Sequence, residues 1–260
     1  MRLSIDVTLE YRLDRPQPAL LAVEPARSPG QATPRSHTDV AGARLRRIAG
    51  EAGVGTRLWA DVPDTVLRLR HTAEIAVAAP GAPLESLAAA PMDALPAEML
   101  TWLRPSRLVQ CDAFAGFAAS RFGDLSGGAR MAAIRDWVRD EIAYLPATSH
   151  TDTTVLDTFA RREGVCRDFA HVTCALARAA GIPARYAAVY GLGVDPPDFH
   201  AVAQVWLGGA WRLVDATGMC APGEMAVIGV GRDACDAPFM ETEGEATPVF
   251  HSVSVTGVPD

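Results

Sequence analysis

Apolar and polar side chains alternate along the first fifteen residues of the chain. A period of two is typical of a β-strand that buries one face and exposes the other. Extended patterns recur at 58–61 and 65–77, after a stretch rich in Pro, Ala, Arg and Gly. Together these patterns predict an antiparallel β-rich domain over residues 1–80. The apolar positions of the first strand are Leu3, Ile5, Val7, Leu9 and Tyr11.

The pattern then breaks and changes its period. Four prolines, at positions 80, 83, 91 and 96, interrupt regular structure, so we place a linker at 81–98. Beyond it, apolar residues recur at intervals of three and four, as in helices. The sequence predicts these helices at 112–122, 126–144 and 153–161.

Apolar extended runs follow the helices near the end of the second half. They lie at 183–190, 201–207 and 211–214, and the glycines at 208 and 209 join the last two in a hairpin. Helices followed by an antiparallel sheet predict an α+β fold. We assign this second domain to residues 99–260.

A helix that begins near Cys166 joins the predicted helices to the predicted strands. Good helix formers follow Cys166, and Gly181 and Pro183 end the helix. Cys166 is then in the first turn, where free backbone N–H groups and the positive end of the helix favour a thiolate. The thiolate is the nucleophilic form of cysteine, so Cys166 is a candidate nucleophile.

Composition narrows the class of protein. The chain has 260 residues, of which 49% are hydrophobic and 21% are charged, as expected of a globular protein with a sizeable core. Its net charge of −7 argues against nonspecific nucleic-acid binding. No apolar run approaches the roughly 20 residues that span a bilayer, and no signal-peptide pattern opens the chain. We therefore expect a cytoplasmic protein that binds neither nucleic acid nor membrane.

The cysteines fit a reducing compartment. There are five of them, and none forms a Cys-x-x-Cys pair. An odd and scattered set suits free thiols better than a disulfide framework. At least one cysteine is therefore free to react.

A cysteine nucleophile needs a nearby base and a third group that orients the base. His200 stands at the entry of the first hairpin strand, and Asp215 stands at the end of the second. A hairpin turned at Gly208 and Gly209 places His200 nearly opposite Asp215. We expect Cys166, on a helix packed against this sheet, to meet both side chains.

Four motifs in this region resemble the bacterial transglutaminase-like superfamily, whose members are often labelled cysteine proteases. The resemblance covers about residues 100–240 and implies a papain-like α+β fold. It makes Cys166 the nucleophile, His200 the general base and acid, and Asp215 the residue that orients His200. The strand-rich start is similar to the β domain that often precedes such a core. The motifs are Gly-Val-Cys-Arg-Asp-Phe-Ala-His at 164–171, Gly-Ile-Pro-Ala-Arg-Tyr at 181–186, His-Ala at 200–201 and Trp-x-x-x-Asp-Ala-Thr at 211–217.

Two positions depart from the family pattern. Many members have Trp where this chain has Val202, and Pro where it has Ala216. Neither change removes a catalytic atom.

Several other residues of the same region are expected to be structural. His171 lies about 140° around the helix from Cys166, which makes it a poor base for that thiol. Cys174 is expected in the core, and Asp168 near the helix N-terminus or an arginine. Trp206 and Trp211 are expected in the core or in the wall of a groove.

These observations predict a thiol-dependent acyl-transfer enzyme that acts on amide or peptide bonds through a thioester, as a hydrolase or a transamidating acyltransferase. The expected partner is a peptide, protein or amide substrate, with no cofactor and no metal, and the sequence leaves the oligomeric state open. One alternative is a noncatalytic binding module with the same fold. Another is a zinc site made by Cys166, His200 and Asp215, although the paired short spacings of structural zinc sites are missing.

Overall fold

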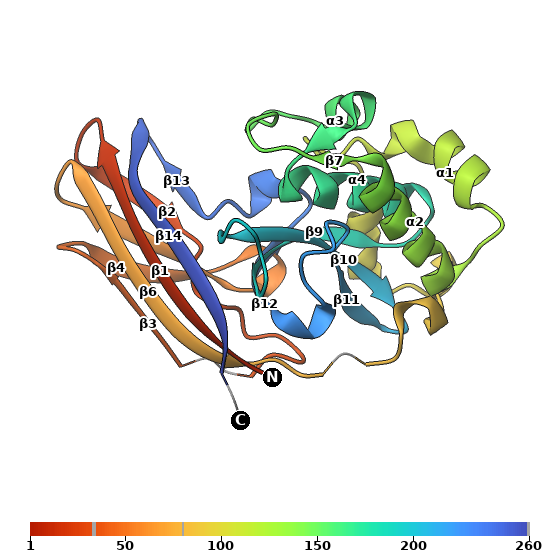
Figure 1. Ribbon diagram of the computed structural model, residues 1–260, viewed down its shortest axis with the longest axis horizontal. Helices are drawn as coiled ribbons and strands as arrows, with labels where there is room; N and C mark the ends of the chain where they lie inside the picture. Colours follow the sequence, from red (N-terminus) through yellow and green to blue (C-terminus); the bar gives the residue numbers. More distant parts are fainter. Residues whose placement is uncertain (33–34, 80, 259–260) are drawn as a thin grey trace.

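The computed structural model describes residues 1–32, 35–79 and 81–258. Two units lie side by side: a β-sandwich, and a sheet with its helices on one side (Figure 1). The chain forms most of the sandwich first, then the helical unit, and returns to the sandwich with its last strands. Among the helices of the described ranges, none combines the length and apolarity that crossing a membrane would require.

The sandwich consists of two four-stranded antiparallel sheets, with strand orders β14-β1-β6-β3 and β13-β2-β5-β4. The apolar positions of the first strand point between the sheets, and Leu3, Val7 and Leu9 are completely buried. The alternation predicted for this strand is therefore confirmed. The strands are β1 (Arg2–Leu13), β2 (Gln17–Leu21), β3 (Arg35–Val40), β4 (Arg44–Ala49), β5 (Thr56–Val62), β6 (Val66–Ala76), β13 (Met240–Thr242) and β14 (Ala246–Val258).

The last strands of the sandwich come from the end of the chain, which differs from the predicted division into 1–80 and 99–260. β14 pairs with β1, so that Val253 lies opposite Val7, and β13 pairs with β2. The sandwich is thus discontinuous in sequence. The sequence did not predict this pairing because β14 is an edge strand that is exposed along most of its length, so it has no clear alternation of apolar and polar residues.

The predicted linker at 81–98 does not run freely between the units. It forms short 3-10 turns, η2 (Leu84–Ser86), η3 (Met92–Ala94) and the start of η4 (Ala97–Leu103), and Leu84 and Leu87 pack on the core. A side chain on Gly128 of the following helix would collide with the Leu84 carbonyl, so the contact is close. Pro80, one of the four prolines at the predicted boundary, lies outside the described residues.

The second unit has the predicted α+β architecture of helices packed on an antiparallel sheet, with strand order β11-β10-β9-β12. Short pieces complete it: η1 (Glu51–Gly53) reaches it from the sandwich, and η5 (Cys111–Phe114), β7 (Ala143–Tyr144), β8 (Glu163–Gly164), η6 (Pro222–Glu224) and η7 (Ala234–Asp236) lie between the main elements. The helices are α1 (Ala115–Phe122), α2 (Gly127–Glu141), α3 (Val155–Arg161) and α4 (Cys166–Ala179), and the strands are β9 (Ala184–Gly191), β10 (His200–Leu207), β11 (Ala210–Val214) and β12 (Met225–Gly231).

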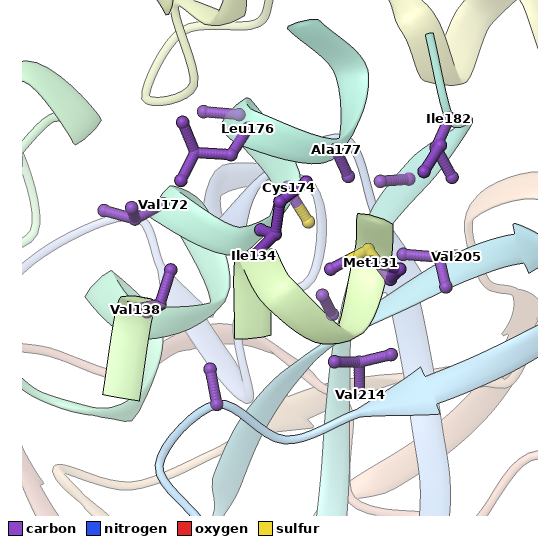
Figure 2. Close-up of a cluster of buried hydrophobic side chains, with 14 of the residues drawn as sticks. Met131, Ile134, Val138, Val172, Cys174, Leu176, Ala177, Ile182, Val205 and Val214 are labelled. Carbon is purple, nitrogen blue, oxygen red and sulfur yellow. The ribbon is translucent and has the colours of Figure 1, made fainter. Parts of the chain in front are cut away.

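Helix α4 is the centre of this unit. Its residues from Asp168 to Arg178 are all buried, so the helix is enclosed on every side rather than along one stripe. Figure 2 shows Cys174 of α4 beside Ile134 and Met131 of α2, with Val205 of the sheet nearby. The enclosed helix fixes the position of its own first residue, Cys166.

The two units are joined by buried polar contacts as well as by apolar packing. Tyr190 of β9 is fully buried, and its hydroxyl donates to the Val23 carbonyl at 2.6 Å. The Gln31 side chain bonds both the N–H and the carbonyl of Val227, at 2.8 and 3.0 Å. The sheet that carries the site is therefore fixed to the sandwich.

Candidate active site

Cys166 is the first residue of α4, and the loop before it is tightly held. The Val165 N–H donates to Oδ2 of Asp168 at 2.8 Å, so Asp168 closes the first turn of the helix. A Cβ on Gly164 would lie only 2.7 Å from Cβ of Asp168, so no side chain fits there. These contacts explain the Gly-Val-Cys-Arg-Asp motif and leave Cys166 half-buried at the helix N-terminus.

His200 and Asp215 meet where the hairpin opens. The observed register pairs Ala203 with Val214 and Leu207 with Ala210, as expected for a turn at the two glycines. His200 Nε2 lies 3.0 Å from Asp215 Oδ2, and both side chains are almost wholly buried.

Asp215 is held as an anion by several donors. Its Oδ1 accepts hydrogen bonds from the Thr217 N–H at 2.8 Å and the Thr217 hydroxyl at 2.7 Å. Its Oδ2 also accepts from the Cys220 N–H at 3.0 Å. Burial would raise the pKa of Asp215, but the hydrogen bond and charge of His200 and the bonds from Thr217 outweigh it and lower the pKa.

His200 is consequently disposed to carry a proton. Burial would lower its pKa, but the hydrogen bond to Asp215, followed by the hydrogen bond and charge of Cys166, raises the pKa to about 9. With Nε2 facing Asp215, the buried Nδ1 makes no close, well-aligned hydrogen bond with the described residues. It is therefore the nitrogen available to the Cys166 sulfur, through the looser contact common in unliganded sites.

Tyr144 is a member of the site that the sequence did not indicate. It lies on β7, whose parallel pairing with β8 places it opposite Gly164, two residues before Cys166. Burial, and then the charge of Cys166, raise the pKa of Tyr144 to about 12, so its hydroxyl stays protonated at neutral pH and close to the thiol. The sequence predicts Tyr144 at the end of the helix at 126–144, because a strand of two residues gives no recognisable pattern.

The remaining residues singled out from the sequence have structural contacts. His171 Nε2 accepts a hydrogen bond from the Ala234 N–H at 3.1 Å, and burial lowers the pKa of His171 to about 3. Cys174 is fully buried, and this burial raises its pKa to about 12. Neither residue faces Cys166 as a base or a second nucleophile.

One group of side chains has the spacing of a metal site. Ligand atoms of His200, Asp215 and Cys220 lie within 4.8 Å of one another. Their chemistry fits a metal poorly, because burial and then the charge of Asp215 raise the pKa of Cys220 to about 12, and its sulfur donates to the Leu192 carbonyl at 3.2 Å. Asp215 already receives hydrogen bonds at both oxygens. His200 and Cys220 are better described as residues that hold the Asp215 carboxylate in place through hydrogen bonds.

The fold is of the α+β class, and its core brings a cysteine, a histidine and a carboxylate close together. Residues 118–216 match the model of the transglutaminase-like superfamily, so this part of the chain is similar to a transglutaminase-like core.

A solved structure resembles the whole chain. It is the crystal structure of a proposed cysteine protease from Cytophaga hutchinsonii, which is 27% identical and superposes with a TM-score of 0.91 over 100% of this chain and 91% of its own. The match therefore includes the sandwich as well as the core.

Curated relatives match over shorter segments. An uncharacterized protein of Mycobacterium leprae is 36% identical over 109 residues, which are 38% of this chain and 39% of that protein. An uncharacterized protein of Mycobacterium tuberculosis is 31% identical over 135 residues, which are 44% of this chain and 43% of that protein. The matched segments thus span less than half of these relatives.

Proposed function

We propose that this protein is a thiol-dependent acyl-transfer enzyme that acts on amide or peptide bonds through Cys166, His200 and Asp215. The observation that carries the proposal is a half-buried cysteine at a helix N-terminus, close to a buried histidine whose partner is a carboxylate that accepts hydrogen bonds at both oxygens. The match to a transglutaminase-like core supports the same reaction class.

The reaction begins with the Cys166 thiolate and the His200 imidazolium. The sulfur attacks the carbonyl carbon, and the carbonyl oxygen becomes the oxyanion of a tetrahedral intermediate. His200 donates its Nδ1 proton to the leaving nitrogen, the C–N bond breaks, and a thioester to Cys166 remains. Asp215 keeps the imidazole oriented and stabilises its positive charge throughout.

Two donors are available to the oxyanion. The Cys166 backbone N–H belongs to the first turn of α4, where N–H groups have no partner within the helix. The Tyr144 hydroxyl lies against Cys166 and stays protonated. Removing one oxyanion donor costs about 100-fold in kcat in well-studied cases. Tyr144→Phe is therefore expected to slow acyl transfer far more than it slows alkylation of the thiol, which forms no oxyanion.

The thioester is resolved by water or by an amine. Water attack, with His200 accepting the proton, gives a carboxylic acid and makes the protein a peptidase or amidase. An amine gives a new amide and makes it a transamidating enzyme. Hydrolysis is the primary proposal, because water needs no site of its own, whereas transamidation needs an amine site and water exclusion.

A mass-spectrometric experiment tests this proposal. The protein would be incubated with a mixture of peptides and small amides, with and without a primary amine, and both the products and the mass of the intact protein would be followed. We expect cleaved amides and an acyl adduct on Cys166, both lost in Cys166→Ala and kept in Cys174→Ala. A wild-type protein that forms no adduct and no product with any substrate would favour the noncatalytic binding module.

The cellular location is a separate proposal. All five cysteines are free, which suits a reducing compartment such as the cytoplasm. Fractionation of cells that express the tagged protein would test it, and recovery in an oxidising compartment would contradict it.

A further inference from the structure

The core sheet has two faces, and helix α4 covers only one of them. Ala203 and Val205 of β10 point toward α4, which lies on that side of the sheet (Figure 1). Because neighbouring residues of a strand point to opposite faces, Gln204 points the other way, as does Arg185 of the adjacent β9. The second face lines a cavity of about 1340 Å³.

This cavity lies where three parts of the chain meet. Its walls come from the core sheet, from the segment between the two units, and from loops of the sandwich near Gln31 and Val54. None of Cys166, His200 and Asp215 lines it. Its volume exceeds the roughly 300–1,000 Å³ of ordinary ligand sites, so it can hold a small molecule together with water.

Arg185 is the unusual residue of the cavity. It is only 7% exposed, and its Nε donates to Oε1 of Gln204 at 2.9 Å. No carboxylate of the described residues pairs with it. Burial alone accounts for the lowering of its pKa to about 10, so no nearby anion offsets the cost of burying the charge. The two terminal nitrogens of its guanidinium have no hydrogen-bond acceptor among the described side chains and carbonyls, and Arg185 lines the cavity.

Indole rings hold Arg185 and continue along the wall. The guanidinium carbon lies 4.0 Å from the centre of the Trp211 ring and 5.6 Å from that of Trp102. Trp206 is the next ring, 5.6 Å from Trp211. Stacking presents the edge of the guanidinium, which carries its N–H groups, for binding an anion in a fixed plane. The rings beside it offer an apolar surface.

None of the other charged side chains described below neutralises Arg185. Arg135 also lines the cavity, but it is paired with Asp136 at 2.9 Å and with Glu85 at 3.4 Å. The glutamates of the lining, Glu51, Glu85 and Glu98, are all exposed to solvent. Arg185 is thus the buried cation that a ligand would have to neutralise.

We propose that this cavity is a second binding site, which takes a small organic acid whose carboxylate pairs with Arg185 and whose apolar body lies against the indole rings. A carboxylate matches the guanidinium with two parallel hydrogen bonds, which is the strong form of this pair. The site is separate from the acyl-transfer chemistry, so it does not depend on the proposed function.

Matched pairs of acids and amides test this site. The probes are 3-phenylpropionate, 3-phenylpropionamide and inorganic phosphate, and binding is measured by calorimetry on the full chain and by the change in melting temperature. We expect the acid to bind at least tenfold more tightly than the amide and to raise the melting temperature, with phosphate alone weaker than the acid. Cys166→Ala should bind the acid as the wild type does.

Two variants locate the binding. Arg185→Gln should lose the preference for the acid, and Arg135→Gln, which removes a paired arginine of the same lining, should keep it. If Arg185→Gln does not fold, Arg185→Lys is the variant to use. It keeps the charge but not the planar fork, and it should lose most of the preference for the acid. Equal binding of acid and amide to the wild type, no binding of the acid at millimolar concentration, phosphate binding as tight as the acid, or a preference that survives Arg185→Lys would each overturn the assignment.

Discussion

Two places along helix α4 contain the same three residue types, and they differ in every property that matters for reactivity. At the first turn, Cys166 lies close enough to His200 to raise the pKa of that histidine, and His200 is hydrogen-bonded to Asp215. In the middle of the helix, Cys174 and His171 lie near Asp233. The pKa of His200 is raised to about 9, while that of His171 is lowered to about 3.

The difference comes from the direction of the hydrogen bonds. His200 donates to the carboxylate of Asp215, which favours the imidazolium. His171 accepts from the Ala234 N–H, which requires an unprotonated ring nitrogen. Asp233 accepts from the N–H groups of Leu108 and Cys235 at 2.9 Å, and among the described residues no hydrogen bond joins it to His171. A cysteine, a histidine and a carboxylate near one another therefore form a triad only when the histidine donates a hydrogen bond to the carboxylate.

The largest expected effect is the contrast between the two cysteines. Cys166 is half-buried beside His200, whereas Cys174 is fully buried and its pKa is raised to about 12. We expect brief iodoacetamide treatment of the native protein to label Cys166 at least 100-fold faster than Cys174, because ordinary thiolate fractions scale tenfold per pKa unit. Peptide mapping would measure it. The exposed Cys235 is the internal competitor, and preferential labelling there would contradict a thiolate at Cys166.

Replacing His200 should have the next largest effect. In His200→Asn the imidazolium is gone, and an ordinary thiol is only about 3% thiolate at pH 7, so alkylation of Cys166 should slow about 30-fold. The matched control is His171→Asn, which changes the other histidine near α4 and should leave the rate within about twofold. Rates of Cys166 alkylation at pH 7 decide it. Equal slowing in both variants would mean that the loss is a general effect of destabilisation.

Removing the charge of Asp215 should have a smaller effect in the same direction. Asp215→Asn destabilises the His200 imidazolium, so alkylation at pH 7 should slow about tenfold and its half-maximal pH should rise. The midpoint belongs to the coupled thiol and imidazole. An amide also cannot accept all four hydrogen bonds that reach Asp215, so we expect a loss of about 1–3 kcal/mol in unfolding free energy.

Asp233→Asn is the control for this prediction, because Asp233 is also buried and also accepts backbone N–H bonds. It should lose stability without changing the pH profile of Cys166. If Asp215→Asn has the same effect as Asp233→Asn, Asp215 is a structural residue and the site is a Cys166–His200 dyad.

The smallest effect is on stability against pH, where the two histidines act in opposite directions. The raised pKa of His200 adds stability that is fully present below its unfolded value of about 6.5 and is lost as pH rises toward about 9. The lowered pKa of His171 works in reverse, and stability is lost as pH falls from about 6.5 toward about 3. The unfolding free energy of both Asn variants would be measured in urea as a function of pH. Its dependence on pH should become flatter only on the alkaline side in His200→Asn and only on the acid side in His171→Asn. Unchanged slopes would contradict a charged His200 and a neutral His171.

The parts of this site that follow from local periodicity could be predicted from the sequence. The glycines at 208 and 209 set the hairpin register, which places His200 near Asp215, and the helix after Cys166 follows from its good helix formers. The place of Tyr144 in the site could not be predicted, because it is set by a two-residue strand that is too short to give a sequence pattern. The roles of Thr217 and Cys220 as donors to Asp215 were also missed, since the backbone turn that aims their N–H groups has no periodic signature.

The same limit applies to the fold. The first strand of the sandwich could be predicted because it buries every second residue, whereas β14 is exposed along most of its length. Arg185 lies within a motif that the family resemblance brought out, but its lack of a carboxylate partner is a property of the assembled cavity. Contacts between segments that are distant in sequence therefore could not be predicted from the local pattern of residues.

The charge state of His200 at neutral pH shows directly whether the site holds an imidazolium ready to pair with the Cys166 thiolate. The six histidines of the chain would be labelled with ¹⁵N in their rings, the His200 signals assigned by comparison with His200→Asn, and the spectra followed over pH. We expect both nitrogens of His200 to carry protons at pH 7 and one of these protons to be lost with a midpoint at about 9, while His171 stays neutral down to about pH 4. A neutral His200 at pH 7, with an ordinary midpoint near 6.5, would contradict this expectation.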